Sequence, residues 1–209
     1  MKGSSNCLVV AGPSGVGKST LINRALEHKP GWLFSVSATT RPKRNNEVEG
    51  QEYYFMDEAQ FMADAASGSF LEYADVYGNM YGTPVRELNR ARRDGKHLLI
   101  EVDTVGCLSI RALRPEIPLV AILPPSIAEL KQRLIDRGTE SAESLERRFL
   151  AIVAEIQRMR SFDFALINGN LETATGQLVA LMTVVEQDLH RSARLADSIL
   201  ATAQGVIDA

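Results

Sequence analysis

The chain has 209 residues, of which 45% are hydrophobic and 23% are charged, which is the composition of one ordinary globular domain with a substantial core. Its formal net charge of −3 argues against broad binding to nucleic acid or to an anionic membrane, because both require a basic surface, but it leaves room for a local basic cleft. No stretch approaches the length of a membrane span, and the apolar run behind Lys2 is too short for a signal peptide, so we expect a cytoplasmic protein.

The first predicted elements flank a glycine-rich loop. Cys7–Ala11 is typical of a buried strand, and apolar residues at helical spacing predict a helix over Thr20–His28. The loop between them has the form G-x-x-x-x-G-K-[ST] and reads Gly12-Pro13-Ser14-Gly15-Val16-Gly17-Lys18-Ser19. Its backbone N–H groups would bind a polyphosphate at the positive end of a helix dipole. We expect Lys18 to reach the β- and γ-phosphates and Ser19 to ligate Mg²⁺. A glycine turn that binds nothing is the disfavoured alternative.

A small mixed insertion, rich in aromatic residues, follows over residues 37–90. The strand-like runs around it are Trp32–Ser37, Glu52–Phe55 and Phe70–Tyr77. We expect a helix from the N-cap Asp57 through Ala66, and a second helix to Arg93 with Thr83 as N-cap and Pro84 at its first position.

Strands and helices then alternate to the end of the chain. The predicted strands are Lys96–Asp103, Pro118–Leu123 and Phe164–Ile167, and the predicted helices are Leu108–Leu113, Ile127–Asp136, Ser141–Arg160 and Leu171–Leu189. This alternation predicts an α/β fold with a parallel sheet and helices on both faces. The last 20 residues have apolar residues at helical spacing, which predicts one more helix that packs on the body or mediates self-association. Cys7 and Cys107 are too few for a metal cage, and we expect two buried free thiols.

Three groups of polar residues are candidates for a second substrate site. Arg41, Arg44, Tyr53 and Tyr81 combine guanidinium forks with phenol hydroxyls, which suits a phosphate dianion. Glu72 and Asp103 are carboxylates on strands, and a carboxylate can accept both the N1–H and the N2–H₂ of guanine, with the Ser37 and Thr83 hydroxyls near its O6. Arg133, Arg137 and Arg148 lie on two basic helices that would form a lid over polyphosphate. Solvated surface charges are the alternative for each group.

These motifs together closely resemble guanylate kinase. The matching stretches are GPSGVGKST (12–20), FSVSATTR (34–41), EVEGQEYYF (47–55), FLEYADVYGNMYGTP (70–84), LLIEVD (98–103), PPS (124–126) and KQRLIDRGTES (131–141), within a match over residues 7–187. The resemblance implies a P-loop fold with a core (1–36, 91–125 and 161–190), a GMP-binding region (37–90) and a lid (126–160), plus an extra helix (190–209). It also implies the reaction ATP + GMP ⇌ ADP + GDP with Mg²⁺, with dGMP as a second acceptor.

The resemblance also implies a role for each site residue. ATP would be bound by Gly12, Pro13, Ser14, Gly15, Val16, Gly17, Lys18, Ser19 and Thr20 together with Arg133, Arg137 and Asn168. GMP would be bound by Ser37, Arg41, Arg44, Tyr53, Glu72, Tyr81, Thr83, Asp103 and Arg148. The catalytic charges would be those of Lys18, Arg41, Arg137 and Arg148, and Ser19 would be the metal ligand.

The sequence departs from the family pattern at two positions and at its end. Val105 stands where the family commonly has Gln, Gly169 stands where it commonly has Asp, and the chain runs some 20 residues past the usual end. Two rival hypotheses remain: a related P-loop kinase that acts on a sugar phosphate, and a catalytically silent binding module. The intact Glu72, Ser37 and Tyr81 disfavour the first, and the intact Gly17-Lys18-Ser19 disfavours the second. Whether the chain is a monomer or a homo-oligomer stays open.

Overall fold

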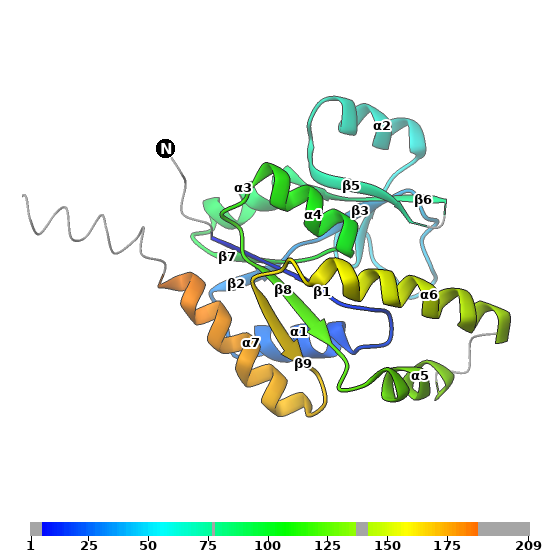
Figure 1. Cartoon of the computed structure of the whole chain (residues 1–209). Helices are drawn as coiled ribbons and strands as arrows, with labels where there is room; N and C mark the ends of the chain where they lie inside the picture. The colour runs from blue at the N-terminus through cyan, green and yellow to red at the C-terminus, as the bar shows by residue number, and fades with distance from the viewer. Residues whose placement is uncertain (1–5, 77, 137–141, 188–209) are drawn as a thin grey trace, which may run out of the picture.

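The computed structural model describes residues 6–76, 78–136 and 142–187, with the backbone alone over 142–150. Its core is a five-stranded parallel sheet in the order β2-β7-β1-β8-β9 (Figure 1). The strands are β1 (Cys7–Ala11), β2 (Trp32–Phe34), β7 (His97–Glu101), β8 (Leu119–Leu123) and β9 (Phe164–Ile167). The predicted α/β fold with a parallel core sheet is thereby confirmed.

Helices cover both faces of this core sheet (Figure 1). One face carries α1 (Lys18–Glu27) and α7 (Leu171–Glu186), and the other carries α3 (Val85–Arg93) and α4 (Thr104–Leu113). The chain between β8 and β9 forms α5 (Ile127–Asp136) and α6 (Ala142–Met159). Ser126 caps α5 as expected, because its hydroxyl accepts a hydrogen bond from the Glu129 N–H at 3.1 Å.

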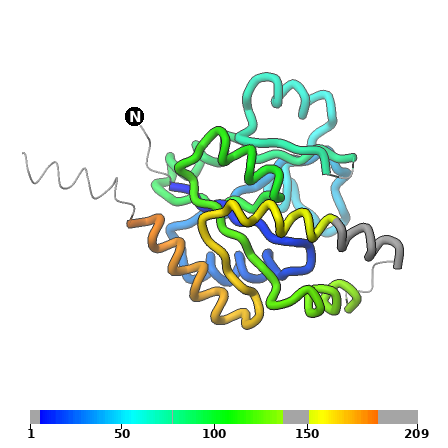
Figure 2. The backbone as a smooth tube through the Cα atoms, in the orientation of Figure 1, coloured from blue at the N-terminus to red at the C-terminus, as the bar shows by residue number. Residues whose placement is uncertain are grey.

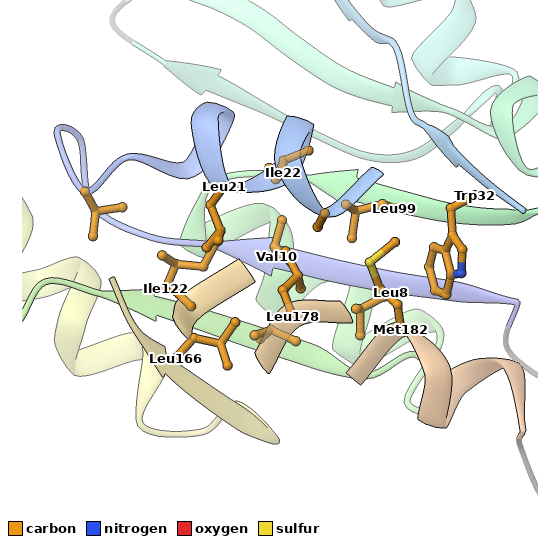
Figure 3. Close-up of a cluster of buried hydrophobic side chains, with 14 of the residues drawn as sticks. Leu8, Val10, Leu21, Ile22, Trp32, Leu99, Ile122, Leu166, Leu178 and Met182 are labelled. Atoms are coloured by element: carbon orange, nitrogen blue, oxygen red, sulfur yellow. The ribbon is translucent and has the colours of Figure 1, made fainter. Parts of the chain in front are cut away.

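The central strand β1 contributes to two separate hydrophobic clusters. Leu8 and Val10 point toward α1 and α7, where they pack with side chains such as Leu178 (Figure 3). Cys7, Val9 and Ala11 belong to the cluster under α3 and α4. Successive strand residues face opposite sides, so a strand that is covered on both faces must be apolar throughout. This explains the unbroken apolar run of β1, in which the fully buried Leu8 contributes about 2 kcal/mol.

The segment between β2 and α3 forms a second, four-stranded sheet in the order β4-β3-β6-β5. Its elements are β3 (Ser37–Thr39), β4 (Tyr53–Phe55), α2 (Glu58–Ala66), β5 (Phe70–Val76) and β6 (Asn79–Pro84). Figure 2 shows this segment on the same side of the core as α3 and α4. Helix α2 begins at its predicted N-cap Asp57, and its buried Phe61 stacks on Phe70 with ring centroids 4.5 Å apart.

Three local predictions were wrong. The strand expected over Trp32–Ser37 is split, because β2 ends in the core sheet at Phe34 and β3 starts in the second sheet at Ser37. Thr83 does not cap α3: it lies in β6, its hydroxyl donates to Glu72, and Pro84 is the N-cap, outside the helix. The helix expected from Leu108 begins at Thr104, because Asp103 accepts a hydrogen bond from the Gly106 N–H at 2.7 Å and caps it.

The two cysteines match the expectation of buried free thiols. Burial raises the pKa of Cys7 to about 11, and it raises the pKa of Cys107 as well, so both remain protonated at neutral pH. The helix expected over residues 190–209 lies outside the described residues. No helix of the described part of the chain is both long and apolar enough to cross a membrane.

A polar cluster joins α7 to the beginning of β2. The Glu186 carboxylate accepts hydrogen bonds from the indole N–H of Trp32 and from Lys29 Nζ, each at 2.7 Å. Trp32 also stacks on His97, with ring centroids 4.9 Å apart. Because one carboxylate serves two donors, its loss leaves both without that acceptor.

We therefore expect Glu186→Ala to lower the free energy of unfolding by about 1–2 kcal/mol, since the buried indole N–H loses its acceptor. Urea unfolding followed by far-ultraviolet circular dichroism measures this difference. Glu172→Ala, which removes an exposed acid from the first turn of the same helix, is the control and should cost a few tenths of a kcal/mol. Equal losses in the two variants would contradict the proposed contribution of Glu186.

Candidate active site

The glycine-rich loop joins β1 to α1 at the carboxyl edge of the core sheet. Gly15 and Gly17 adopt φ angles of 85° and 92°, in the left-handed region that favours glycine. The loop surrounds a hollow of about 140 Å³, whose walls are Ser14, Gly15, Gly17, Lys18, Ser19 and Thr20. A shallow hollow ringed by loop glycines at a helix N-terminus has the geometry of an anion site.

A backbone carbonyl of the loop holds the Lys18 side chain over the loop. Its Nζ donates to the Gly12 carbonyl at 2.7 Å and lies 3.8 Å from Glu101 Oε1, at the end of β7. Burial raises the pKa of Glu101, and the charge of Lys18 opposes that rise. Sequence reasoning did not single out Glu101; its place at the end of a buried strand, two residues before Asp103, was the available signal.

The back of the loop is clamped through the carbonyl of Val16. The Asn168 side-chain amide donates to this oxygen at 2.8 Å, and Arg133 Nη1 donates to it at 3.3 Å. Arg133 Nη2 also donates to the Asn168 carbonyl at 3.0 Å. A Cβ on Gly17 would lie 2.7 Å from the Asn168 amide nitrogen, so the clamp requires glycine there. The fold thus brings Asn168 and Arg133, both predicted to bind ATP, to the loop.

The second group of predicted residues shares one face of the four-stranded sheet. The strand register pairs Ser37 with Tyr53, and Glu72 with Thr83. Tyr81 lies two residues before Thr83 on β6, so it projects to the same side. Directly paired residues share a face. In the antiparallel pair of β3 with β6, Thr39 lies opposite Tyr81, and Ser37 lies two residues before Thr39 on the same strand. Ser37 and Tyr53 are therefore on the same face as Glu72, Tyr81 and Thr83. Spacing along the chain alone could not establish this shared face.

Glu72 is the buried acid of this face, with 8% of its surface exposed. Its Oε1 accepts a hydrogen bond from the Thr83 hydroxyl at 2.7 Å. Burial raises the pKa of Glu72 to about 7; the Thr83 bond opposes this rise and the charge of Asp103 adds to it. Asp103 is exposed at the N-terminus of α4. The two acids that were predicted to read a base therefore interact with each other.

Gly106 makes the close approach of α4 to Glu72 possible. A Cβ built on Gly106 would lie 2.6 Å from Glu72 Oε2, closer than real Cβ atoms come to oxygen. The glycine thus leaves space for the carboxylate between β5 and the first turn of α4.

Arg41 and Arg44 follow β3, and both contact Glu47. Arg41 Nη2 donates to Glu47 Oε1 at 2.7 Å, a hydrogen bond that raises the pKa of Arg41, and the Arg44 backbone N–H donates to Glu47 Oε2 at 2.8 Å. The Arg41 guanidinium also lies 5.4 Å from the centre of the Tyr53 ring. The Arg44 side chain is exposed. These contacts hold a guanidinium beside the face that carries Glu72.

Four predicted or noted positions remain: Arg137, Arg148, Val105 and Gly169. Arg137 lies outside the described residues; Arg148 lies in α6, where only the backbone is described. Val105 is 47% exposed in the first turn of α4. A Cβ on Gly169 would meet Pro125 at 3.5 Å, an ordinary contact, so this position has room for a side chain.

The oxygen donors near the loop fit Mg²⁺. Ser19 is exposed in the loop hollow, and the carboxylate of Glu101 lies beside Lys18. Within the part of the chain that the structure describes, no three His, Cys, Asp or Glu side chains are grouped to hold a metal. Mg²⁺ is commonly bound by one or two protein oxygens together with waters and substrate phosphates, so a sparse donor set suits it.

A larger hollow of about 420 Å³ lies elsewhere, between α2 and α3. Its walls are Met56, Asp64, Gly68, Ser69, Phe70, Pro84, Val85, Arg86 and Asn89. None of them is a predicted site residue, so its size alone does not make it the better candidate.

Known proteins are similar to this chain over nearly its whole length. The family model described as Guanylate kinase matches residues 4–185. A guanylate kinase of Clostridium acetobutylicum is 38% identical over 200 residues, covering 96% of this chain and 94% of the relative. One of Carboxydothermus hydrogenoformans is 42% identical over 176 residues, covering 84% and 86%. The crystal structure of guanylate kinase from Anaplasma phagocytophilum superimposes with a TM-score of 0.69 at 28% identity, covering 88% of each chain.

The tight contact at Gly106 gives a prediction for stability. We expect Gly106→Ala to lower the free energy of unfolding by about 1–3 kcal/mol, because the new methyl group must displace the Glu72 carboxylate. Gly176→Ala is the matched control: Gly176 is also helical and nothing lies within 4 Å of its Cβ position, so this change should be neutral or stabilise by up to about 1 kcal/mol. Chemical unfolding of both variants measures the difference, and a neutral Gly106→Ala would contradict the crowding.

Proposed function

The chain belongs to the guanylate kinase family and phosphorylates GMP with ATP, and we propose that its two candidate sites divide the substrates between them. The loop of residues 12–20 binds the ATP phosphates, with Lys18 toward the β- and γ-phosphates. The polar face of the four-stranded sheet binds GMP. This division rests above all on Glu72, a buried carboxylate on the same face as Ser37, Tyr81 and Thr83.

We assign the guanine ring to Glu72 and its neighbours. Guanine has two adjacent donors, N1–H and N2–H₂, which match the two oxygens of an ionised carboxylate. Adenine has a donor beside an acceptor there, so the same carboxylate would leave a lone pair facing a lone pair. Ser37 and Thr83 supply hydroxyls for O6, and Asp103 orients the ligand from the other side. A sugar phosphate has no base to pair with these groups, which disfavours the rival kinase hypothesis.

We assign the GMP phosphate to Arg41, Arg44, Tyr53 and Tyr81. Arg41 is bound to Glu47 in the described structure, and the approach of a phosphate dianion would offer it a second acceptor on the side of Tyr53. A guanidinium has five donors, so it can keep the Glu47 bond while it binds phosphate. Glu47 would then position Arg41 for the substrate.

Transfer requires positioning and charge neutralisation, without a covalent intermediate. An oxygen of the GMP phosphate attacks the γ-phosphorus in line, a P–O bond forms, and the bond from the γ-phosphorus to the β,γ-bridging oxygen breaks to release ADP. The attacking phosphate oxygen is already ionised, so no strong general base is needed. We assign charge stabilisation to Lys18, Arg41, Arg137 and Arg148.

We propose that Mg²⁺ accompanies ATP, held by Ser19, with Glu101 placed to orient its waters. When bound, the ion would neutralise charge on the β- and γ-phosphates. The clamp of Asn168 and Arg133 on Val16 keeps the loop in the shape that receives these phosphates. We further propose that α5 and α6 form the lid, that residues 37–90 form the GMP-binding region, and that the enzyme works in the cytoplasm, where free thiols such as Cys7 and Cys107 persist.

A substrate panel tests the proposed acceptor. We expect ADP release with ATP and Mg²⁺ when GMP or dGMP is offered, and none above background with AMP, CMP, UMP or a ribose phosphate. Lys18→Met is the control, with kcat lowered by about 10²-fold or more while the fold is kept, because the positive charge that stabilises the transferring group is lost. Turnover with the sugar phosphate would overturn the base-reading role of Glu72, and silence with all acceptors would favour the binding module.

The raised pKa of Glu72 predicts how GMP binding depends on pH. The ionised carboxylate accepts the two guanine donors, so KM for GMP should rise by about tenfold for each pH unit below about pH 7, where Glu72 must first lose a proton. The GMP phosphate also gains a proton near pH 6. Glu72→Gln separates the two effects, because it keeps the titration of the phosphate and removes that of the carboxyl. If both enzymes gave the same pH profile, the assignment of guanine to Glu72 would fail.

A further inference from the structure

Glu87 is a buried acid that no step above uses. It lies in the first turn of α3 with 1% of its surface exposed. Burial of a carboxylate is costly unless hydrogen bonds satisfy it. Here both oxygens are satisfied: Oε2 accepts from the Val36 backbone N–H at 2.9 Å and from Arg90 Nη2 at 2.8 Å, and Oε1 accepts from the Tyr54 hydroxyl at 3.0 Å.

The bond to Val36 lies where the chain passes from one sheet to the other. Phe34 is the last residue of β2 in the core sheet, and Ser35 N–H still donates to the core strand residue Leu99 at 2.9 Å. Ser37 begins β3 in the second sheet. Val36 is therefore the link residue, and its N–H is bound by a side chain of α3.

Arg90 secures the same link from the core side. Its Nη2 donates to the Phe34 carbonyl at 2.8 Å as well as to Glu87. The chain returns to the core at Pro84, the N-cap of α3, three residues before Glu87. The first turns of α3 therefore lie at both crossings between the sheets, the outgoing one at Val36 and the returning one at Pro84. Hinge motions are commonly absorbed by a few residues at such element ends.

Glu87 also reaches the strand that carries a proposed phosphate ligand. Tyr54 lies on β4, next to Tyr53, and neighbouring strand residues face opposite sides. The Tyr54 ring is held a second time by the Arg86 guanidinium, 3.6 Å from its centre. Fixing Tyr54 on one side of the sheet fixes Tyr53 on the other, beside Arg41.

We propose that Glu87 is a positioning residue for GMP: by holding Val36 and Tyr54 to α3, it sets the orientation of the GMP-binding sheet relative to the phosphate loop without touching substrate. This inference rests on the proposed GMP site. Ser37 follows the bound link residue directly, and Arg41 comes four residues later, so a shift at Val36 moves both GMP ligands. The ATP loop is attached to β1 and α1 and would keep its place.

The test measures KM for GMP and for ATP separately, at pH 8, where Glu72 is ionised. In Glu87→Gln one carboxylate oxygen and the negative charge are lost, and we expect KM for GMP to rise by about five- to tenfold while KM for ATP stays within about twofold. Glu87→Leu, if it folds, should raise KM for GMP further. Glu58→Gln is the control, because it neutralises an exposed acid in the first turn of α2 and should leave both constants unchanged.

Hydrogen exchange at the Val36 amide gives a readout that needs no turnover. We expect exchange at this amide in Glu87→Gln to be about tenfold faster or more, with the amides of β1 unchanged. Equal rises in both KM values, unchanged KM values, or wild-type exchange at Val36 would each overturn the positioning role. Absence of GMP turnover in the wild-type enzyme would instead refute the proposed function, and the exchange result would then stand by itself.

Discussion

The hydrogen bonding of β1 on both of its edges is the constraint on which the rest of the structure depends. The strand pairs with β7 on one side and β8 on the other, and it is apolar on both faces because helices cover both. A strand held in this way delivers the phosphate loop at a fixed point of the sheet edge. Lys18, Glu101 and Asn168 then meet at that point from three different parts of the chain, because parallel neighbours end at the same edge.

Three cationic side chains of the proposed site, Lys18, Arg41 and Arg133, are already partnered by oxygens of the protein. Lys18 has the Gly12 carbonyl and Glu101, Arg41 has Glu47, and Arg133 has the carbonyls of Val16 and Asn168. A buried or half-buried cation without an acceptor would be costly, so these partners stabilise the site before any phosphate arrives. They also fix the positions of these cations before any substrate binds, which lowers the rearrangement that the proposed phosphate binding requires.

The sequence predicted regular elements and local motifs well and tertiary crossings poorly. The bounds of β1 and β9 and the cap at Asp57 were correct, because periodicity and capping chemistry act within a few residues. The apolar run from Trp32 gave no sign of its division between two sheets, since the partner of Val36 lies 51 residues away. Thr83 resembled a helix cap because its hydrogen-bond partner, Glu72, lies on another strand and cannot be identified from the local sequence. The residues that we assign to GMP came from family resemblance, and only the strand register shows that they share one side of the sheet.

The pairing of β3 with β6 has a consequence for how such a chain can change. These strands hold the first and last residues, Ser37 and Pro84, of the segment that forms the four-stranded sheet, and their pairing brings Ala38 opposite Gly82. The two ends of the segment therefore lie about one strand spacing apart, roughly 5 Å. A short connection could bridge them without moving β2, β7 or α3. The four-stranded sheet, to which we assign the acceptor, is thus an exchangeable module, and insertions, deletions or a different set of binding residues can arise within it while the core sheet keeps its register.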